Sequence, residues 1–249
     1  MTLIASHRGG SLEAPENSPT SFRHTAGLGV EQVEFDIHPT ADGHIVVIHD
    51  ATLERTTDGH GKVAALTLAQ LRRLVIKGTA ADRIMTLPEV IEVFRPTGIA
   101  LRMEVKSDAD HRPYPGLLAH ALRLLDAAGM RGRTVVTSFL APIVAEAVQA
   151  PGLLGRIWLV APVVMDDAGL EGVVAAAEAH AIGHVGIRAN RLDARVLAHL
   201  RAAGLGVGAW AVNDEDAVRW MLELGVEIFT TDIPTRAVAL RGSGNNPIS

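Results

Sequence analysis

The sequence predicts an α/β protein, a (β/α)8 (TIM) barrel with a small insertion after the second strand. Strand-like apolar runs and helix-like segments alternate along the whole chain. Eight strand-like runs remain when the second arm of an early hairpin is set aside, and about 250 residues is the usual size of such a barrel. Reactive side chains follow several of these strands, and barrel enzymes place their active sites at the carboxyl ends of the strands. We expect residues 1–249 to form a single domain.

Each element follows from a local pattern: strands from apolar runs between turn residues, helices from apolar residues at helical spacing. The predicted strands are 3–7, 32–37, 99–104, 134–138, 156–159, 184–187, 206–211 and 228–231. The predicted helices are 20–28, a short one at 67–71, one that begins after Thr86, and then 116–128, 142–149, 169–181, 193–203 and 214–223. Asp42-Gly43 predicts a hairpin whose second arm, 45–48, leads to His49.

Local signals also set several boundaries. Thr86, with Glu89 three residues later, has the spacing of a capping box. Glycines lie near the ends of several helices, where glycine favours a stop. The polar stretch 52–82 is read as the insertion, packed beside the mouth of the barrel, and 242–249 as a frayed tail.

Composition and charge exclude several classes of function. The net charge is −5 without a block of Lys or Arg, which predicts no nucleic-acid partner. The chain has no cysteine, so any metal must be bound by oxygen or imidazole. Since no apolar run could span a bilayer and the first strand begins by Leu3, we expect a protein without a membrane span or leader, located in the cytoplasm. A homo-oligomer is compatible with the sequence.

Three reactive clusters lie within the first 50 residues, each at the end of a strand-like run: His7-Arg8-Gly9, Glu34-Phe35-Asp36 and His49-Asp50. Glu34 and Asp36 are two residues apart, so in a strand both face the same side. Adjacent carboxylates repel each other unless a proton or a cation lies between them. A metal site is therefore predicted here. Further candidate side chains lie at the ends of later strands, namely Glu104 with Lys106, and Trp210.

Together these motifs resemble the glycerophosphodiester phosphodiesterase family. In chain order, the resemblance is carried by His7-Arg8-Gly9-Gly10, 14–18 (Ala-Pro-Glu-Asn-Ser), Glu34-Phe35-Asp36, Asp42-Gly43, 47–50 (Val-Ile-His-Asp), 53–59 (Leu-Glu-Arg-Thr-Thr-Asp-Gly), Glu104-Val105-Lys106 and 210–213 (Trp-Ala-Val-Asn). The match covers nearly the whole chain. Ser18 replaces a frequent Thr, and the loop 107–112 is individual to this sequence.

The resemblance implies a TIM barrel with an insertion, a divalent metal, and two histidines that act on a phosphodiester. It places Glu34, Asp36 and Glu104 on the metal, and three carboxylates without a thiolate favour a hard cation, Mg²⁺ or Ca²⁺, with Mn²⁺ as an alternative. His7 and His49 would be the general acid and base, in an order the sequence leaves open.

Other residues are assigned to the substrate. Arg8 and Lys106 would neutralise phosphate oxygens. By the resemblance, Trp210 would pack against the glycerol. Glu16 lines the site or supports a turn, whereas Ser138, Asn213 and Asp232 fit positions that support the site residues or lie at the edge of the substrate. The histidines near these motifs but without a marked spacing are His38, His44 and His60.

The predicted function is that of an enzyme, a phosphodiesterase that hydrolyses small-molecule glycerophosphodiesters to glycerol 3-phosphate and an alcohol. One alternative is a lyase of the phospholipase D or sphingomyelinase D kind that releases a cyclic phosphate. Another is a barrel that binds phosphodiesters without cleaving them. A barrel with Lys106 as a Schiff-base lysine would leave the acidic cluster unexplained. The sequence leaves open the alcohol, the attack by water or by a glycerol hydroxyl, and the oligomeric state.

Overall fold

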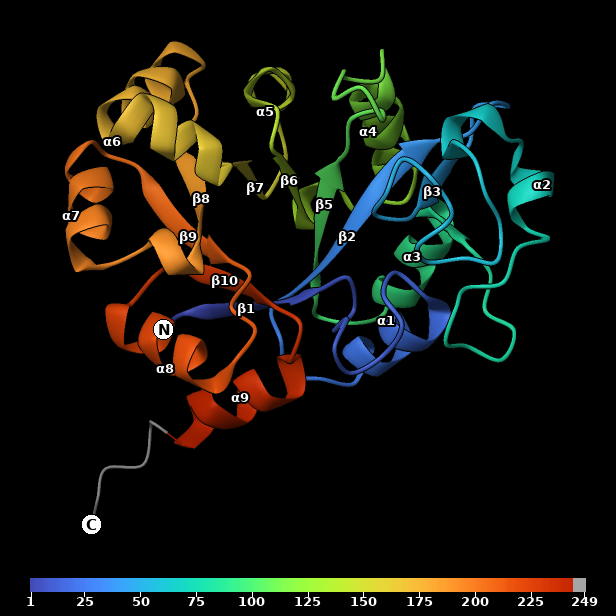
Figure 1. The fold of residues 1–249 in the computed structure, drawn as a ribbon, viewed down its shortest axis with the longest axis horizontal. Coiled ribbons are helices and arrows are strands. Elements are labelled where there is room, and N and C mark those ends of the chain that lie inside the picture. The colour runs from blue at the N-terminus through green and yellow to red at the C-terminus, as the bar shows by residue number, and fades with distance from the viewer. Residues whose placement is uncertain (244–249) are drawn as a thin grey trace.

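The computed structural model is described here for residues 1–243 (Figure 1). Within them, eight parallel strands form a closed barrel, which confirms the predicted fold class. The strands are β1 (Leu3–His7), β2 (Gln32–Pro39), β5 (Ala100–Val105), β6 (Thr134–Ser138), β7 (Gly155–Leu159), β8 (His184–Arg188), β9 (Gly206–Trp210) and β10 (Ile228–Thr231). The barrel closes because β1 pairs with β2 on one side and with β10 on the other.

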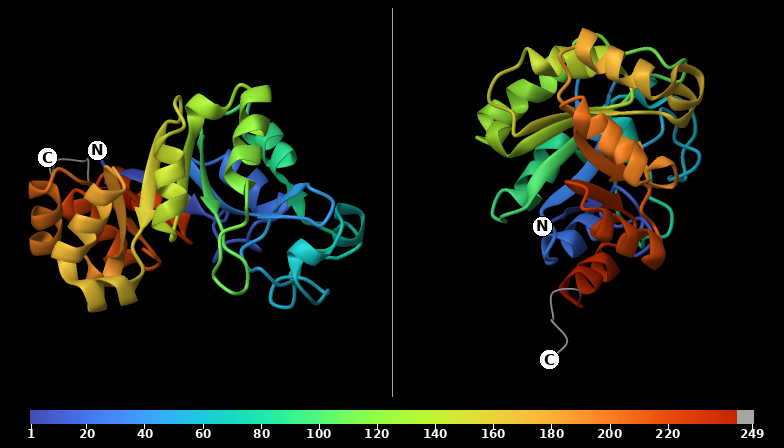
Figure 2. Two further views of the ribbon diagram at one scale, coloured as in Figure 1. Left: turned by 90° about the horizontal axis from the view of Figure 1, so that it is seen from above. Right: turned by 90° about the vertical axis from the view of Figure 1, so that its left-hand side faces the viewer.

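Helices cover the outside of the barrel (Figure 2). They are α1 (Pro19–Ala26), α3 (Leu87–Phe94), α4 (Leu117–Ala127), α5 (Ala141–Val148), α6 (Pro162–Ala179), α7 (Ala194–Ala202), α8 (Glu215–Leu224) and α9 (Pro234–Ser243), with single 3-10 turns at Arg131–Arg133 and Ala189–Arg191. The capping box of α3 is present, since the Glu89 carboxylate accepts the Thr86 backbone N–H at 2.8 Å. Helix α3 buries Val90 and Phe94, which are four residues apart on one face.

A hairpin and an insertion extend one side of the barrel, at the right of Figure 1. Strand β3 (Ile45–Val47) pairs antiparallel with β2, and a two-residue strand that the sequence did not predict, β4 (Met85–Thr86), pairs with β3. Between β3 and β4 lie a 3-10 turn (Val63–Ala65) and the short helix α2 (Leu68–Leu71). This region has its own small apolar cluster, made of Val46, Ile48, Leu53, Val63, Leu71 and Ile84.

Two helices, α6 and α9, differ from the sequence prediction. Helix α6 begins at Pro162 rather than at 169, because proline favours the first turn of a helix, and Gly169 breaks its regular geometry with a φ of 67°. Helix α9 was not predicted, although its apolar residues pack against β1 and α8. Gly242 and Ser243 belong to this helix, and the rest of the expected tail, 244–249, lies outside the described residues.

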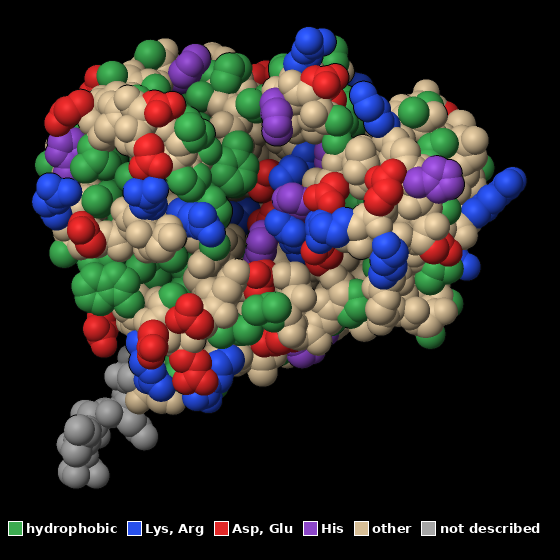
Figure 3. Space-filling view, in the orientation of Figure 1, with side chains coloured by type: hydrophobic (Ala, Val, Ile, Leu, Met, Phe, Trp, Pro, Cys, Tyr) green, Lys and Arg blue, Asp and Glu red, His purple; other side chains and the backbone are tan. Residues whose placement is uncertain are grey.

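The barrel positions one site, at the mouth formed by the carboxyl ends of its strands. Figure 3 shows a hollow near the centre of this face, where acidic, basic and histidine side chains gather. In the described part of the chain, no helix is both long and apolar enough to cross a bilayer.

Candidate active site

The hollow at the mouth is a cavity of about 260 Å³ whose lining joins charged and apolar side chains. It is lined by His7, Arg8, Glu34, His49, Arg102, Glu104, Thr137, Phe139, Leu159, Trp210, Ala211 and Thr230. The charged groups come from β1, β2, β5 and the end of β3, whereas the apolar groups come from the β6, β7 and β9 side. The cavity therefore suits a small molecule with a charged part and an uncharged part.

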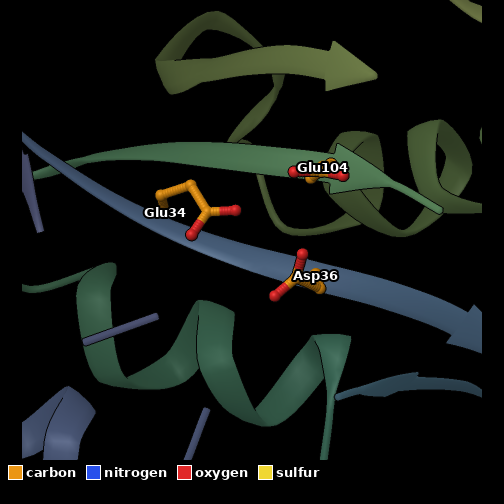
Figure 4. A group of neighbouring side chains, drawn as sticks. All are labelled: Glu34, Asp36 and Glu104. Carbon is orange, nitrogen blue, oxygen red and sulfur yellow. The ribbon is translucent and has the colours of Figure 1, made fainter. Parts of the chain in front are cut away.

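Three buried carboxylates face one another beside this cavity (Figure 4). Glu34 and Asp36 project from the same face of β2, and Glu104 projects from β5, where the register pairs it with Asp36. One ligand atom from each residue lies within 4.8 Å of the others. The alternation of the strand and the pairing of two neighbouring strands thus bring together the three residues that the resemblance placed on a metal.

The carboxylates are electrostatically coupled. Burial, and after it the charge of Asp36, raises the pKa of Glu34 to about 8. Burial also opposes the ionisation of Asp36, but the charges of Lys106 and His49 outweigh burial and hold its pKa well below its usual range. Without a cation, burial and the neighbouring Asp36 therefore disfavour the ionised form of Glu34.

The donor set fits a divalent cation. Glu34 Oε1 and Asp36 Oδ1 are buried without a hydrogen-bond partner, which is a costly arrangement for carboxylate oxygens. A cation between the carboxylates would satisfy both atoms and relieve their repulsion. Because the donors are oxygen atoms, they match the preference of hard cations.

The first loop after β1 is held tightly in place. Arg8 has a left-handed backbone, with a φ of 52°, and its N–H donates to Glu34 Oε2 at 3.0 Å. Gly9, with a φ of 83°, lies so close to α1 that a Cβ atom would be 2.4 Å from Ser21 Oγ. Glycine is therefore required at this position, and the loop fixes Arg8 at the wall of the cavity.

Both candidate phosphate-binding cations lie against carboxylates. The Arg8 guanidinium lies 3.1 Å from Glu16 Oε1 and 3.4 Å from Asp36 Oδ2. Lys106 Nζ lies 2.8 Å from Glu104 Oε1 and 3.5 Å from Asp36 Oδ1. Arg8 lines the cavity directly, whereas Lys106 closes one side of the acidic cluster.

His7 forms a hydrogen-bonded pair with Asp232 from the loop after β10. Its Nδ1–H donates to Asp232 Oδ1 at 2.5 Å, and the same carboxylate accepts from Ser11 Oγ and from Asn213 Nδ2. Burial disfavours the charged imidazole, but the Glu34 charge and the bond to Asp232 outweigh it and raise the pKa of His7. Since Nδ1 is engaged, Nε2 is the ring nitrogen that remains available for proton exchange.

His49 forms a second pair, with its neighbour Asp50. The Nδ1–H of His49 donates to Asp50 Oδ1 at 2.5 Å, and Arg55 Nε donates to the other oxygen at 2.6 Å. Arg55 also binds Glu16 at 2.7 Å, so Glu16 joins Arg8 and Arg55 at the mouth. Burial opposes ionisation of Asp50, but the hydrogen bonds from Arg55 and His49 outweigh it and lower its pKa to about 2.

An apolar wall faces the two histidines. Trp210 and Phe139 pack edge to face with ring centroids 5.4 Å apart, and Leu159 lies beside them. Trp210 Nε1 donates to Gly186 O at 3.2 Å, which fixes the indole against the barrel. Trp210 thus lines the cavity, and so do Phe139 and Leu159, which were not predicted from the sequence.

The tertiary structure also places three further polar residues in or beside the site. Arg102 is 1% exposed inside the barrel, two residues before Glu104 on the same face of β5, a spacing that could have revealed it. Ser138, for which a supporting position or the edge of the substrate was expected, donates its hydroxyl to Val105 O at 2.9 Å and supports a loop. His38, not expected to act as a ligand, is fully buried, and burial lowers its pKa to about 4.

Comparison with known proteins agrees with this geometry. The sequence profile of the glycerophosphoryl diester phosphodiesterase family matches residues 7–236. The chain belongs to this family. The resemblance found in the sequence motifs is therefore confirmed over nearly the whole chain.

Individual members of the glycerophosphoryl diester phosphodiesterase family are similar to different degrees. A glycerophosphodiester phosphodiesterase of Caldanaerobacter subterraneus is 35% identical over 143 residues, which span 55% of this chain and 58% of that protein. One from Bacillus altitudinis is 29% identical, and the alignment covers 97% of this chain and 98% of that protein. The first alignment spans only part of its relative, and the second spans nearly all of it.

Solved structures of related proteins have the same fold. A protein of Agrobacterium tumefaciens, provisionally named a glycerophosphoryl diester phosphodiesterase, superimposes with a TM-score of 0.96 at 41% identity over 98% of both chains. An Oleispira antarctica phosphodiesterase, solved in complex with its product sn-glycerol-3-phosphate, has a TM-score of 0.82 at 26% identity over 96% of both chains.

Proposed function

We propose that this protein is a divalent-cation-dependent enzyme that hydrolyses glycerophosphodiesters to glycerol 3-phosphate and an alcohol. The observation that carries the proposal is the placement of two carboxylate-paired imidazoles and a buried acidic cluster around one cavity. The product bound by the Oleispira relative supports the same class of small-molecule substrate. Membership of the family supports the reaction type.

The histidines carry the proton transfers in this proposal. Each Nδ1–H is committed to a carboxylate, so each Nε2 is available to the substrate. One Nε2 takes a proton from the attacking oxygen, and the other gives a proton to the oxygen of the leaving alcohol. The paired aspartates hold each ring in the required tautomer, and Asp232 stabilises the charged form of His7.

The remaining charged residues bind and balance the phosphate. Glu34, Asp36 and Glu104 would hold the cation, which would supply Lewis-acid polarisation of the phosphoryl group. Arg8 faces the cavity and would contact the phosphate oxygens through its planar fork. Lys106 would offset the charge of the acidic cluster while the phosphate is bound. Trp210 offers an apolar face to the glycerol carbons.

The test measures glycerol 3-phosphate released from glycerophosphodiesters by the metal-stripped protein, before and after addition of Mg²⁺, Ca²⁺ or Mn²⁺. We expect release only with a cation, and loss of Mn²⁺ binding by calorimetry in Glu34→Gln. Glu223→Gln, a substitution at an exposed position on α8, is the matched control and should bind Mn²⁺ as the wild type does. A cyclic phosphate that persists in ³¹P NMR would identify a lyase instead, and binding without turnover would contradict catalysis.

A further inference from the structure

His38, a third histidine, connects the site to a separate loop. It lies on β2 and is fully buried. Both of its ring nitrogens have partners: Nε2 lies 3.1 Å from the backbone oxygen of His49, and Nδ1 lies 3.1 Å from the Tyr114 hydroxyl. The ring of Tyr114 packs edge to face on that of His38, at 5.6 Å and 81°.

The chemistry of the partners fixes the direction of both hydrogen bonds. A backbone carbonyl oxygen only accepts, so Nε2 of His38 must carry a proton and donate to His49 O. The Nδ1 atom of a neutral imidazole is then an acceptor, and the Tyr114 hydroxyl donates to it. The result is an ordered chain from Tyr114 through His38 to the backbone of His49.

The backbone of His49 needs this contact with His38 because the imidazole of His49 is hydrogen-bonded to its neighbour in the chain. It lies beyond the end of β3, after the last ladder contact in which Ile48 N–H donates to Asp36 O at 3.1 Å. Its imidazole is bonded to Asp50, the next residue in the chain, so the pair can move together with the backbone. The contact from His38 instead links the His49 backbone to the barrel.

Tyr114 is delivered by a compact loop that begins directly after Lys106. Residues 107–113 are folded around Asp108, whose carboxylate accepts the backbone N–H groups of Asp110 at 2.9 Å and Arg112 at 2.8 Å. Ser107 and Pro113 form an isolated bridge that brings the two ends of this loop together. The loop thus presents Tyr114, the single tyrosine of the chain, in a fixed place beside His38.

We propose that Tyr114 and His38 are positioning residues that hold His49 in place through its backbone carbonyl, so that the loop 107–113 sets the efficiency of proton transfer by His49. This inference rests on the proposed phosphodiesterase function. Neither residue lines the cavity in the described structure, so both act through His49 rather than on the substrate.

The test begins with Tyr114→Phe, which removes only the hydroxyl. We expect kcat for a glycerophosphodiester to fall about two- to tenfold, the range of one hydrogen bond, with KM unchanged. His38→Ala should lower kcat further, and His38→Gln should restore most of the loss because its amide can donate to His49 O and accept from Tyr114. Thr97→Val, which removes a hydroxyl bonded to Phe94 O before β5, is the matched control and should leave kcat unchanged.

A double-mutant cycle separates positioning from general structural support. In a His49→Ala background there is no imidazole to position, so Tyr114→Phe should leave the residual kcat unchanged. Equal losses in both backgrounds would overturn the inference, as would an unchanged kcat for Tyr114→Phe in the wild-type background.

Hydrogen exchange gives a readout that does not need turnover. Tyr114→Phe should speed exchange of two hydrogen-bonded amides beside His49, those of Ile48, which donates to Asp36 O, and Val63, which donates to Ala51 O, and leave those of β9 unchanged. If the wild type releases no glycerol 3-phosphate, the proposed function fails, and unchanged exchange at Ile48 and Val63 would overturn the positioning role of Tyr114 and His38 as well.

Discussion

The two histidines of the site form the same kind of hydrogen-bonded pair, but their aspartate partners come from different parts of the chain. His7 and His49 both donate Nδ1–H to an aspartate at 2.5 Å. The partner of His7 lies 225 residues away in the sequence, whereas the partner of His49 is its immediate neighbour. One pair is therefore made by closure of the barrel, and the other by a single dipeptide.

The surroundings of the two pairs differ accordingly. Asp232 is held by Ser11 and Asn213, from the loops after β1 and β9, in addition to His7 at the end of β1. Asp50 is held by Arg55, which belongs to the insertion and has a side chain that is 48% exposed. The pair formed by His7 and Asp232 is therefore anchored by loops of the barrel. The pair formed by His49 and Asp50 is anchored by a residue of the insertion.

The largest effect is expected from removal of either imidazole. His7→Ala and His49→Ala should each lower kcat/KM by about 10²- to 10⁴-fold, since general acid–base catalysis contributes that much. His44→Ala, at an exposed position in the hairpin, should keep full activity. Steady-state kinetics with a glycerophosphodiester would check this, and near-normal turnover by either variant would show that the two histidines are not equivalent partners.

The two aspartates should differ in their effects. Asp232→Asn should lower kcat about 100-fold, because a part-buried hydrogen-bond network loses its charged acceptor. Asp50→Asn should cost about tenfold, because that carboxylate is more exposed and His49 keeps its contact with His38. Both values come from kcat at saturating substrate. A larger loss for Asp50→Asn would reverse the comparison.

The pKa of His7 provides a pH-dependent test. The Asp232 carboxylate stabilises the protonated ring and helps to raise its pKa. Asp232→Asn removes that charge, so the ring should lose its proton at a lower pH than in the wild type. Titration of the ring protons by NMR in the metal-free protein measures the shift. A pKa that is unchanged or higher would mean that Asp232 does not support the charged ring.

The smallest effect concerns the anchor of His49. Arg55→Gln should lower the free energy of unfolding at pH 7 by about 1 kcal/mol, a modest value because Arg55 is half exposed. Arg55 helps to lower the pKa of Asp50 to about 2, so its stabilisation is present above the unfolded pKa of about 4 and is lost as pH falls toward 2.

Urea unfolding at pH 7 and pH 3 therefore should show a smaller difference between Arg55→Gln and the wild type at the lower pH. Arg23→Gln is the matched control, because Arg23 is 67% exposed and lies 3.9 Å from Asp82, too far for a strong pair. A difference that grows at pH 3 would contradict the assigned role of Arg55.

Much of the barrel could be read from local patterns. The eight strands, the hairpin at Asp42-Gly43 and the capping box at Thr86 follow from periodicity and turn chemistry, which act over a few residues. The start of α6 was missed although Pro162 is a local signal for it, whereas the whole of α9 could not be read in this way. Helix α9 has an irregular apolar pattern, and its stability comes from packing against β1 and α8.

The sequence by itself determined that Glu34 and Asp36 share a face and that His49 lies beside Asp50, because strand alternation and chain neighbourhood are local facts. Only the tertiary structure decided that Asp232 serves His7. Closure of the barrel pairs Ser6 with Thr231, so the residues that follow these two meet at the mouth. Such a contact depends on the register between the first and last strands, which no short stretch of sequence encodes.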